Sequence, residues 1–276
     1  MKRSPFTALL ATAVALTFAA CSKQEAAAPA APVAAVDLSA ETATYKKWVE
    51  VQIDNLLADT QKFAQALSAG NVKEAKRLYA PTRMSFERSE PVAESFGDLD
   101  PRIDNREADL EAGEKWTGFH PIEKILWTKN TTKGTEQLAT QLVNDIKELR
   151  AKVATAEVTG ELMVQGAVDL LNEVSTGKIT GEEEIFSHTD LYDFKANIEG
   201  AEKIFEIFTP KLQAKNAALV TTLTEKFKAV NDLLAKHQEG EGYKSYTKLT
   251  KNDTKELAEA VNKLGEPLAQ MGIILK

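Results

Sequence analysis

Residues 116–127 read Trp-Thr-Gly-Phe-His-Pro-Ile-Glu-Lys-Ile-Leu-Trp, and this stretch predicts a helix with a polar pair in its first turn. Pro121 suits the first turn of a helix, because its missing N–H would find no partner there. His120 and Glu123 are three residues apart, so their side chains share one helical face. An imidazole beside a carboxylate is a ligand pair for zinc, iron or copper. A complete site needs further donors from other segments.

The composition limits the classes of fold and partner. The chain has 276 residues, one cysteine and a net charge of -7, with a pI near 5.3. This length is sufficient for one large domain or two small ones with a buried core. The acidic balance argues against general nucleic-acid binding, so we expect no nucleic-acid partner.

The N-terminus is typical of an exported protein. Two basic residues precede an apolar run over residues 6–20, which is too short to span a membrane. Cys21 follows at the position of a bacterial lipobox cysteine, although Phe18 replaces the usual leucine. We therefore predict a signal peptide over residues 1–20, lipidation of Cys21, and a periplasmic protein whose only membrane attachment is its lipid anchor. Simple signal-peptidase cleavage is the alternative, and Ser22 resembles the outer-membrane sorting pattern.

The remainder divides into a tether and a helical domain. Residues 21–38 are rich in alanine and proline and contain no aromatic residue, which predicts a tether. In residues 39–276 the apolar positions recur at helical spacing, and no long period-two alternation predicts a sheet. The expected fold is all-α, as two stacked four-helix bundles. The predicted helices cover residues 41–69, 72–79, 135–154, 161–174, 189–208, 210–236 and 253–274.

Residues 81–96 concentrate carboxylates in a way that suggests a nearby cation. One helix over this segment would place four charged side chains on a common face: Arg83, Glu87, Glu90 and Glu94. The carboxylates on such a face repel one another unless a cation lies against them. Pro91 disfavours helical geometry in the residue before it, so we predict a kink or a new helix start there.

The candidates for additional metal ligands come from this segment and from the acidic loop predicted at residues 97–107. Glu87 and Glu90 are the first candidates, and Asp104 is the next. Each has a structural alternative. Glu87 would pair with a neighbouring arginine, and Asp104 would cap a following helix.

A second dense patch of polar residues lies at residues 178–194. Glu184 and His188 are four apart and would form a second helical ligand pair. The alternative is a helix start at this point, with Thr189 or Asp190 capping backbone groups. His237 ends a later helix, where a cation suits the helix dipole, and we interpret it as structural.

Several motifs in this order resemble a known family. They are Tyr79–Arg83, Glu90–Phe96, Asp98–Asp100, Gly118–Glu123, Leu126–Trp127, Lys178–Glu184 and Ser187–Leu191. They resemble the imelysin-like (peptidase M75-like) domain of the EfeO/EfeM lipoproteins, from about residue 40 to the end. The resemblance implies two four-helix bundles, a periplasmic metal site on the His-x-x-Glu motif, and iron uptake beside an iron permease and a haem peroxidase. Longer members carry a cupredoxin domain, so this chain is similar to the short form.

The residues favour a metal-binding protein over an enzyme. Proline follows His120, and the sequence contains no His-Glu-x-x-His, so we expect no metallopeptidase activity. His120 and Glu123 with Glu87, Glu90 or Asp104 form a mixed nitrogen and oxygen donor set. Such a set suits iron, with zinc and copper as competitors. Binding should weaken as the pH falls through the histidine range, because a protonated ring cannot ligate.

The alternative function is binding of an anionic polysaccharide such as alginate, which one short member of the family binds. An acidic chain must then gather its cations into a local cleft. The candidates are the arginines that lie close to the acidic segments: Arg83, Arg88, Arg102 and Arg106. High salt would abolish polyanion binding but leave inner-sphere metal coordination largely intact.

Overall fold

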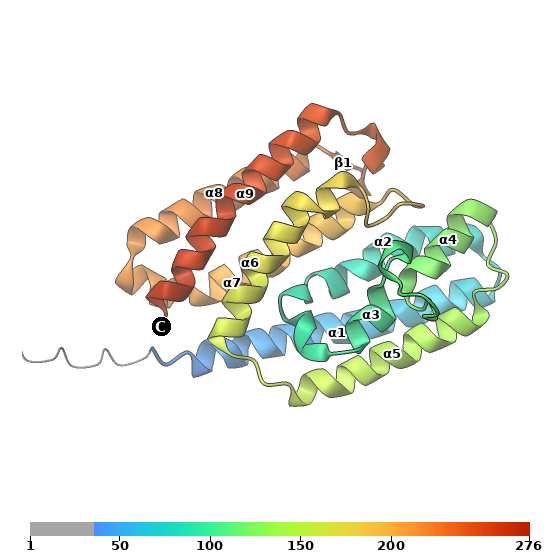
Figure 1. The fold of residues 1–276 in the computed structure, drawn as a ribbon, viewed down its shortest axis with the longest axis horizontal. Coiled ribbons are helices and arrows are strands. Elements are labelled where there is room, and N and C mark those ends of the chain that lie inside the picture. The colour runs from blue at the N-terminus through green and yellow to red at the C-terminus, as the bar shows by residue number, and fades with distance from the viewer. Residues whose placement is uncertain (1–35) are drawn as a thin grey trace, which may run out of the picture. The chain divides into compact units, whose positions relative to one another are not determined.

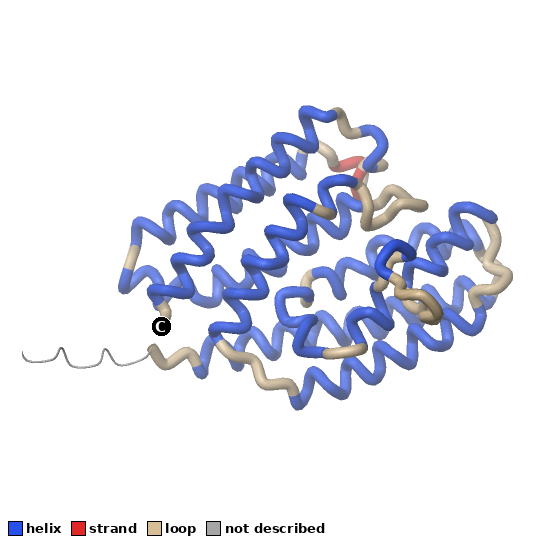
Figure 2. Tube along the Cα trace, viewed as in Figure 1, coloured by secondary structure: helices blue, strands red, loops and turns tan. Residues whose placement is uncertain are grey.

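The computed structural model describes residues 36–276, so Cys21, the predicted signal peptide and most of the predicted tether lie outside the described residues. The described chain forms nine α-helices (Figures 1 and 2): α1 (Ser39–Ser68), α2 (Val72–Glu87), α3 (Leu99–Asp104), α4 (Phe119–Lys129), α5 (Glu136–Thr155), α6 (Gly160–Thr176), α7 (Asp190–Lys215), α8 (Ala217–Ala235) and α9 (Lys251–Ile274). Within residues 36–276, each helix is too short or too polar to cross a bilayer.

Short elements connect these helices. The 3-10 helices are η1 (Glu90–Phe96), η2 (Glu107–Asp109), η3 (Lys178–Thr180) and η4 (Tyr246–Lys248). The strands β1 (Gln238–Glu239) and β2 (Gly242–Tyr243) form a small antiparallel pair that the sequence pattern does not predict. Two-residue strands are too short to show a period-two alternation.

The helices pack as two groups, and the predicted all-α fold is confirmed. In one group α1 packs against α2 and α5, α4 contacts α2 and α5, and α3 lies against α5. In the other, α6, α7, α8 and α9 follow one another and pack as a four-helix bundle (Figure 1). Contacts of α2 with α7, and of η1 with α6, join the two groups.

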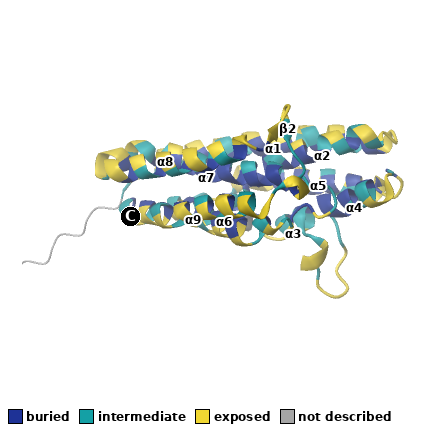
Figure 3. Cartoon of the chain, turned by 90° about the horizontal axis from the view of Figure 1, so that it is seen from above, coloured by how far each residue is buried: buried dark blue, intermediate teal, exposed yellow. Residues whose placement is uncertain are grey.

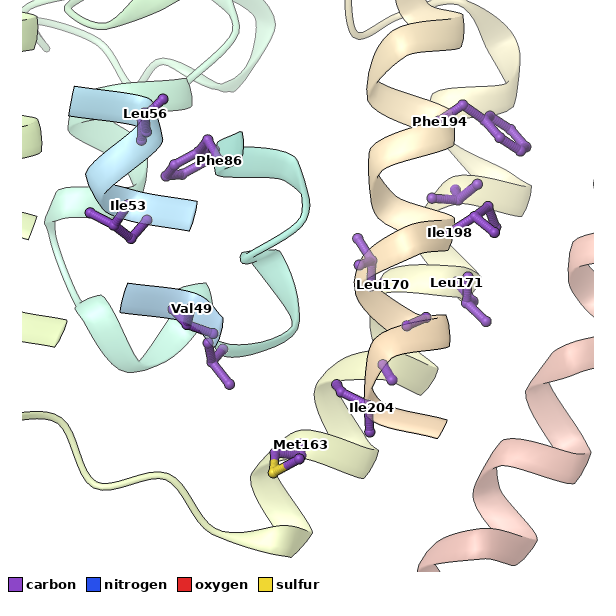
Figure 4. Packing of buried hydrophobic residues seen from close by; sticks show 14 of the residues in the cluster. Val49, Ile53, Leu56, Phe86, Met163, Leu170, Leu171, Phe194, Ile198 and Ile204 are labelled. Atoms are coloured by element: carbon purple, nitrogen blue, oxygen red, sulfur yellow. The ribbon is translucent and has the colours of Figure 1, made fainter. Parts of the chain in front are cut away.

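Both groups contribute buried side chains to one continuous apolar core. Val49, Ile53 and Leu56 recur every three or four residues along α1, so one face of this helix is apolar and meets Phe86 of α2 (Figure 4). In the second group the corresponding side chains come from α6 and α7: Met163, Leu170, Leu171, Phe194, Ile198 and Ile204. Buried residues follow the inward faces of the helices (Figure 3). Burial of each such side chain contributes roughly 1.5–3 kcal/mol.

Two predicted helix ends are wrong, because both were placed at prolines. α2 continues through Pro81 to Glu87, and α7 continues through Pro210 to Lys215. A proline inside a helix removes one backbone hydrogen bond. Packing of the apolar residues on both sides of Pro81 offsets this local cost, since Ala80 and Phe86 are buried in the core.

The segment after α2 differs in part from its prediction. The predicted interruption near Pro91 is confirmed, because α2 ends at Glu87 and η1 begins at Glu90. The predicted loop over residues 97–107 contains α3, whose Leu99 and Ile103 are buried. These apolar positions are four residues apart, which is the spacing that a short helix buries on one face.

Gly166 allows η1 to lie directly on α6. A Cβ atom at this position would stand 1.7 Å from the carbonyl oxygen of Pro91, a distance that no side chain permits. The close approach holds the start of η1, and therefore Glu90, against the second bundle.

We expect Gly166→Ala to lower the free energy of unfolding by about 1–3 kcal/mol, because α6 must move away from η1 to admit the methyl group. Gly265→Ala in α9 is the matched control, since the nearest atom to its new Cβ would lie at 3.8 Å. This control should raise stability by up to about 1 kcal/mol through helix propensity. Urea denaturation measures both values, and equal effects of the two substitutions would contradict the close-packing account.

Candidate metal centre

The site is organised around a buried arginine. Arg83 of α2 has an exposed fraction of 0%, and its guanidinium bonds Glu87 one helical turn later and Asp104 at the end of α3. Three further carboxylates approach it from the second half of the chain: Glu184 at 2.5 Å, Asp193 at 3.2 Å and Glu183 at 3.3 Å. Five acids from four segments therefore surround one guanidinium, whose planar fork presents five N–H groups.

A second buried cation lies beside Arg83. Lys178 of η3 is 2% exposed, and its Nζ donates to Glu87 Oε2 at 2.9 Å and Glu90 Oε1 at 3.0 Å. Asn197 of α7 donates from Nδ2 to both of these carboxylates. Burial raises the pKa of Glu87, but Lys178 and Arg83 outweigh it and hold that pKa below its usual range. Burial and the charge of Glu87 instead raise the pKa of Glu90 well above its ordinary value.

Gly118 determines where α4 begins. It precedes the helix with φ 92°, in the left-handed region that favours glycine, and a Cβ atom there would lie 2.1 Å from the carbonyl oxygen of Ile103. The start of α4 is thus held against the end of α3, which carries Asp104. Trp116 and Trp127 support this helix: Trp116 Nε1 donates to a backbone carbonyl, and Trp127 packs on the edge of Tyr79.

His120 occupies the first turn of α4 and is 1% exposed. Its Nδ1 lies 3.3 Å from Glu123 Oε2, while its Nε2 lies 3.5 Å from Asp104 Oδ1 and 3.8 Å from Glu183 Oε1. Among residues 36–276, Nε2 finds no hydrogen-bond partner. Burial and Arg83 lower the pKa of His120, but Asp104 and Glu123 outweigh them and raise it to about 9.

Glu123 connects α4 to the segment at residues 177–189. Its Oε1 accepts the backbone N–H groups of Phe186 at 3.0 Å and Ser187 at 2.7 Å. The neighbouring Glu184 accepts from Ser187 Oγ and from the Tyr79 hydroxyl. Burial and the charge of Glu123 raise the pKa of Glu184 well above its ordinary value, which favours the protonated form of this carboxyl. A bound cation would favour loss of that proton.

The structure brings the five candidate ligands named from the sequence close together: His120, Glu123, Glu87, Glu90 and Asp104. Three groups have donor atoms within 4.8 Å of one another: Asp104 with His120 and Glu183, His120 with Glu123 and Glu184, and Glu87 with Glu90 and Asp104. His120 and Asp104 each belong to two groups, so the three form one continuous cluster.

The predicted helical pair of Glu184 and His188 does not form. Residues 183–187 form turns and no helix, and His188 has φ 58°, so the two side chains do not share a helical face. The helix α7 begins at Asp190 with Thr189 as its N-cap residue, which places a helix start where the alternative expected it. The Asp190 carboxylate accepts the N–H of Glu184 rather than capping α7.

Four contributors to the site were not selected from the sequence: Lys178, Glu183, Asp193 and Asn197. Asp193 and Asn197 are four residues apart on a face of α7 that also buries Phe194 and Ile198. Polar residues within an apolar stripe are a signal that could have identified them. In the described chain, Asp193 Oδ2 and Asn197 Oδ1 lack hydrogen-bond partners.

The cluster holds more acids than cations. Seven carboxyl groups surround Arg83, Lys178 and one histidine: Glu87, Glu90, Asp104, Glu123, Glu183, Glu184 and Asp193. Buried carboxylates without counter-ions are costly, so they either take up protons or bind a cation. Imidazole and carboxylate oxygens are suitable donors for a transition metal ion.

The fold and the site define a class of helical proteins with a buried histidine and carboxylate centre. The sequence profile of the imelysin (peptidase M75) family matches residues 41–271, and the chain belongs to this family. A protein of Staphylococcus haemolyticus (strain JCSC1435), named Efem/EfeO family lipoprotein, is 53% identical over 241 residues, which cover 86% of this chain and 84% of the relative. A protein of Staphylococcus aureus (strain MSSA476) with the same name is 50% identical over 243 residues, covering 86% of each chain. The resemblance to this family is therefore confirmed.

We expect Arg83→Met to lower the free energy of unfolding by about 3–5 kcal/mol, because it removes a buried charge whose carboxylate partners stay behind. Arg77→Met is the control. Arg77 forms an exposed pair with Glu74 in the same helix, and its loss should change stability by no more than about 1 kcal/mol. Chemical denaturation at pH 7 without metal measures both, and a small effect at Arg83 would show that the cluster neutralises itself by protonation.

Proposed function

We propose that this protein is an exported, lipid-anchored metal-binding protein that acts in iron uptake. Iron is the proposed cargo, and zinc and copper are the competing ions. The relatives named Efem/EfeO family lipoprotein support both the uptake role and the anchor at Cys21. An iron permease and a haem peroxidase are the proposed partners, and the periplasmic side of a membrane is the proposed location. Outer-membrane attachment belongs to the same proposal and rests on Ser22.

The observation that carries this proposal is the orientation of His120. Glu123 Oε2 lies beside Nδ1, which places the proton on that nitrogen in the neutral ring and leaves the Nε2 lone pair free. Nε2 faces Asp104 and Glu183 and has no hydrogen-bond partner within the described residues. In a metal-ligating histidine, one ring nitrogen usually donates its N–H to a carboxylate. The other ring nitrogen then faces the metal ion and the remaining ligands.

The proposed donor set differs from the one expected from sequence. His120 Nε2, Asp104 and Glu183 supply the primary donors, while Glu123 orients the imidazole and the 177–189 segment. Glu184 adds an oxygen once its proton leaves. Glu87 and Glu90, which the sequence put forward as ligands, instead contact the Lys178 ammonium in this arrangement.

The family label does not imply proteolysis here. A zinc peptidase of the His-Glu-x-x-His type uses two histidines as ligands and an adjacent glutamate as a general base. The three donor groups found in the described chain contain one histidine, and both oxygens of Glu123 already accept or face polar groups of the protein. We therefore propose a binding protein and not an enzyme.

The arginines considered for a polysaccharide site are paired with acids. Arg83 is buried among carboxylates, and Arg88 bonds Glu199. Arg102 pairs with Asp98, Asp145 and Glu148, and Arg106 pairs with Asp109 and Glu182. Paired arginines offer little attraction to a polyanion, so metal binding is the function that the site supports better.

Titration of the metal-stripped protein tests the proposal. With ferrous, ferric, zinc and copper ions, we expect one ion to bind per chain, and His120→Ala to lose this binding. His237→Ala is the matched control, because His237 follows the end of α8 and belongs to none of the three donor groups. Calorimetry in 0.5 M salt distinguishes coordination from surface attraction. Equal binding by both variants would overturn the proposal.

The pH dependence of metal binding follows from the raised pKa of His120. Because this pKa is about 9 in the metal-free protein, the ring is protonated at pH 7 and must release its proton to ligate. The apparent affinity should rise about tenfold per pH unit from pH 6 to 8 and level off above pH 9. Dissociation constants measured across this range give the slope. An affinity that is flat over these pH values would exclude His120 as a ligand.

A further inference from the structure

The side chain of Lys178 occupies a position that a metal ion could hold. Its ammonium group lies 2.9 Å from Glu87 Oε2, 3.0 Å from Glu90 Oε1 and 3.7 Å from Glu183 Oε1. Glu87 and Glu90 also form one of the three potential metal-binding groups, with Asp104 as the third member. The Lys178 ammonium group is thus a compact cation that lies among these oxygens and is covalently part of the chain.

This position is adjacent to the proposed metal position. Glu183 Oε1 lies 3.7 Å from Lys178 Nζ and 3.8 Å from His120 Nε2, so the same oxygen faces both places. Asp104 belongs to the donor groups on both sides. Carboxylates shared between neighbouring cations are typical of two-ion centres in helical bundles.

Beside this buried position, a pocket lies against Glu90, one of the two carboxylates that bond Lys178. Glu90 lines a pocket of about 180 Å³ whose wall includes three further acids, Asp100, Asp169 and Glu173. Asn197, which donates to Glu87 and Glu90, keeps its Oδ1 buried and without a partner in the described part of the chain. An ion that enters this pocket would meet the carboxyl groups of Asp100, Asp169 and Glu173 beside Glu90.

We propose that the centre contains two adjacent cation positions and that the Lys178 ammonium permanently fills the second one. This inference rests on the proposed metal-binding function and extends it. Lys178 limits the protein to one ion and shares Glu183 with that ion. Because η3 and Glu183 belong to the same 177–189 segment, the tethered cation and a shared donor come from one piece of chain.

Metal stoichiometry tests this inference directly. The wild-type protein, Lys178→Ala and Lys178→Arg are dialysed to equilibrium against zinc ions, and bound metal is measured by elemental analysis. We expect one ion per chain in the wild type and in Lys178→Arg, but two in Lys178→Ala. The double variant Lys178→Ala, Glu90→Gln should return to one, because it removes a donor of the second position.

Melting temperatures measured with and without zinc show whether the Lys178→Ala variant is folded. Lys178→Ala removes the ammonium group that Glu87 and Glu90 share, so its melting temperature should fall without metal and recover with zinc more than that of the wild type. One ion in both the wild type and Lys178→Ala would overturn the second position but leave the proposed function intact. No ion in the wild type with one in Lys178→Ala would overturn the proposed function and support the second position. No ion in either would overturn both.

Discussion

The burial of one guanidinium imposes the main constraint on this structure. Arg83 lies fully out of water, and such a charge is tolerated only when carboxylates surround it with well-placed hydrogen bonds. Its five acidic partners come from α2, α3, α7 and the 177–189 segment, so these four pieces must meet at one point. Lys178 and His120 balance part of the surplus of acid that results, and the remainder is the physical reason for proposing a metal ion here.

Neither bundle contains the complete centre. The first supplies His120 and Asp104, and the second supplies Glu183 together with Lys178. The donors are therefore positioned by the packing of α2 against α7 and of η1 against α6, where Gly166 permits the closest approach. The proposed metal binding and the association of the two bundles would depend on the same contacts, so we expect a substitution that weakens one to weaken the other.

Local patterns predicted the part of the site that lies close together in sequence. His120 and Glu123 share a helical turn, and Glu87 lies one turn after Arg83, so spacing alone indicated both pairs. Lys178 could not be selected in this way, because its role depends on contacts with residues about ninety positions earlier. The helical class followed from apolar periodicity, whereas the continuation through Pro81 depended on burial that the sequence pattern does not reveal.

The distance along the chain between Arg83 and Asp193 has a consequence for folding. These residues are 110 positions apart, and closing so long a loop costs entropy that only native packing offsets. Until then the acids repel one another and contribute nothing favourable. Helical hairpins such as α1 with α2, or α8 with α9, involve neighbours in sequence and are suited to form earlier. We therefore expect the charged centre to be among the last parts to assemble, which would restrict the proposed metal binding to the folded protein.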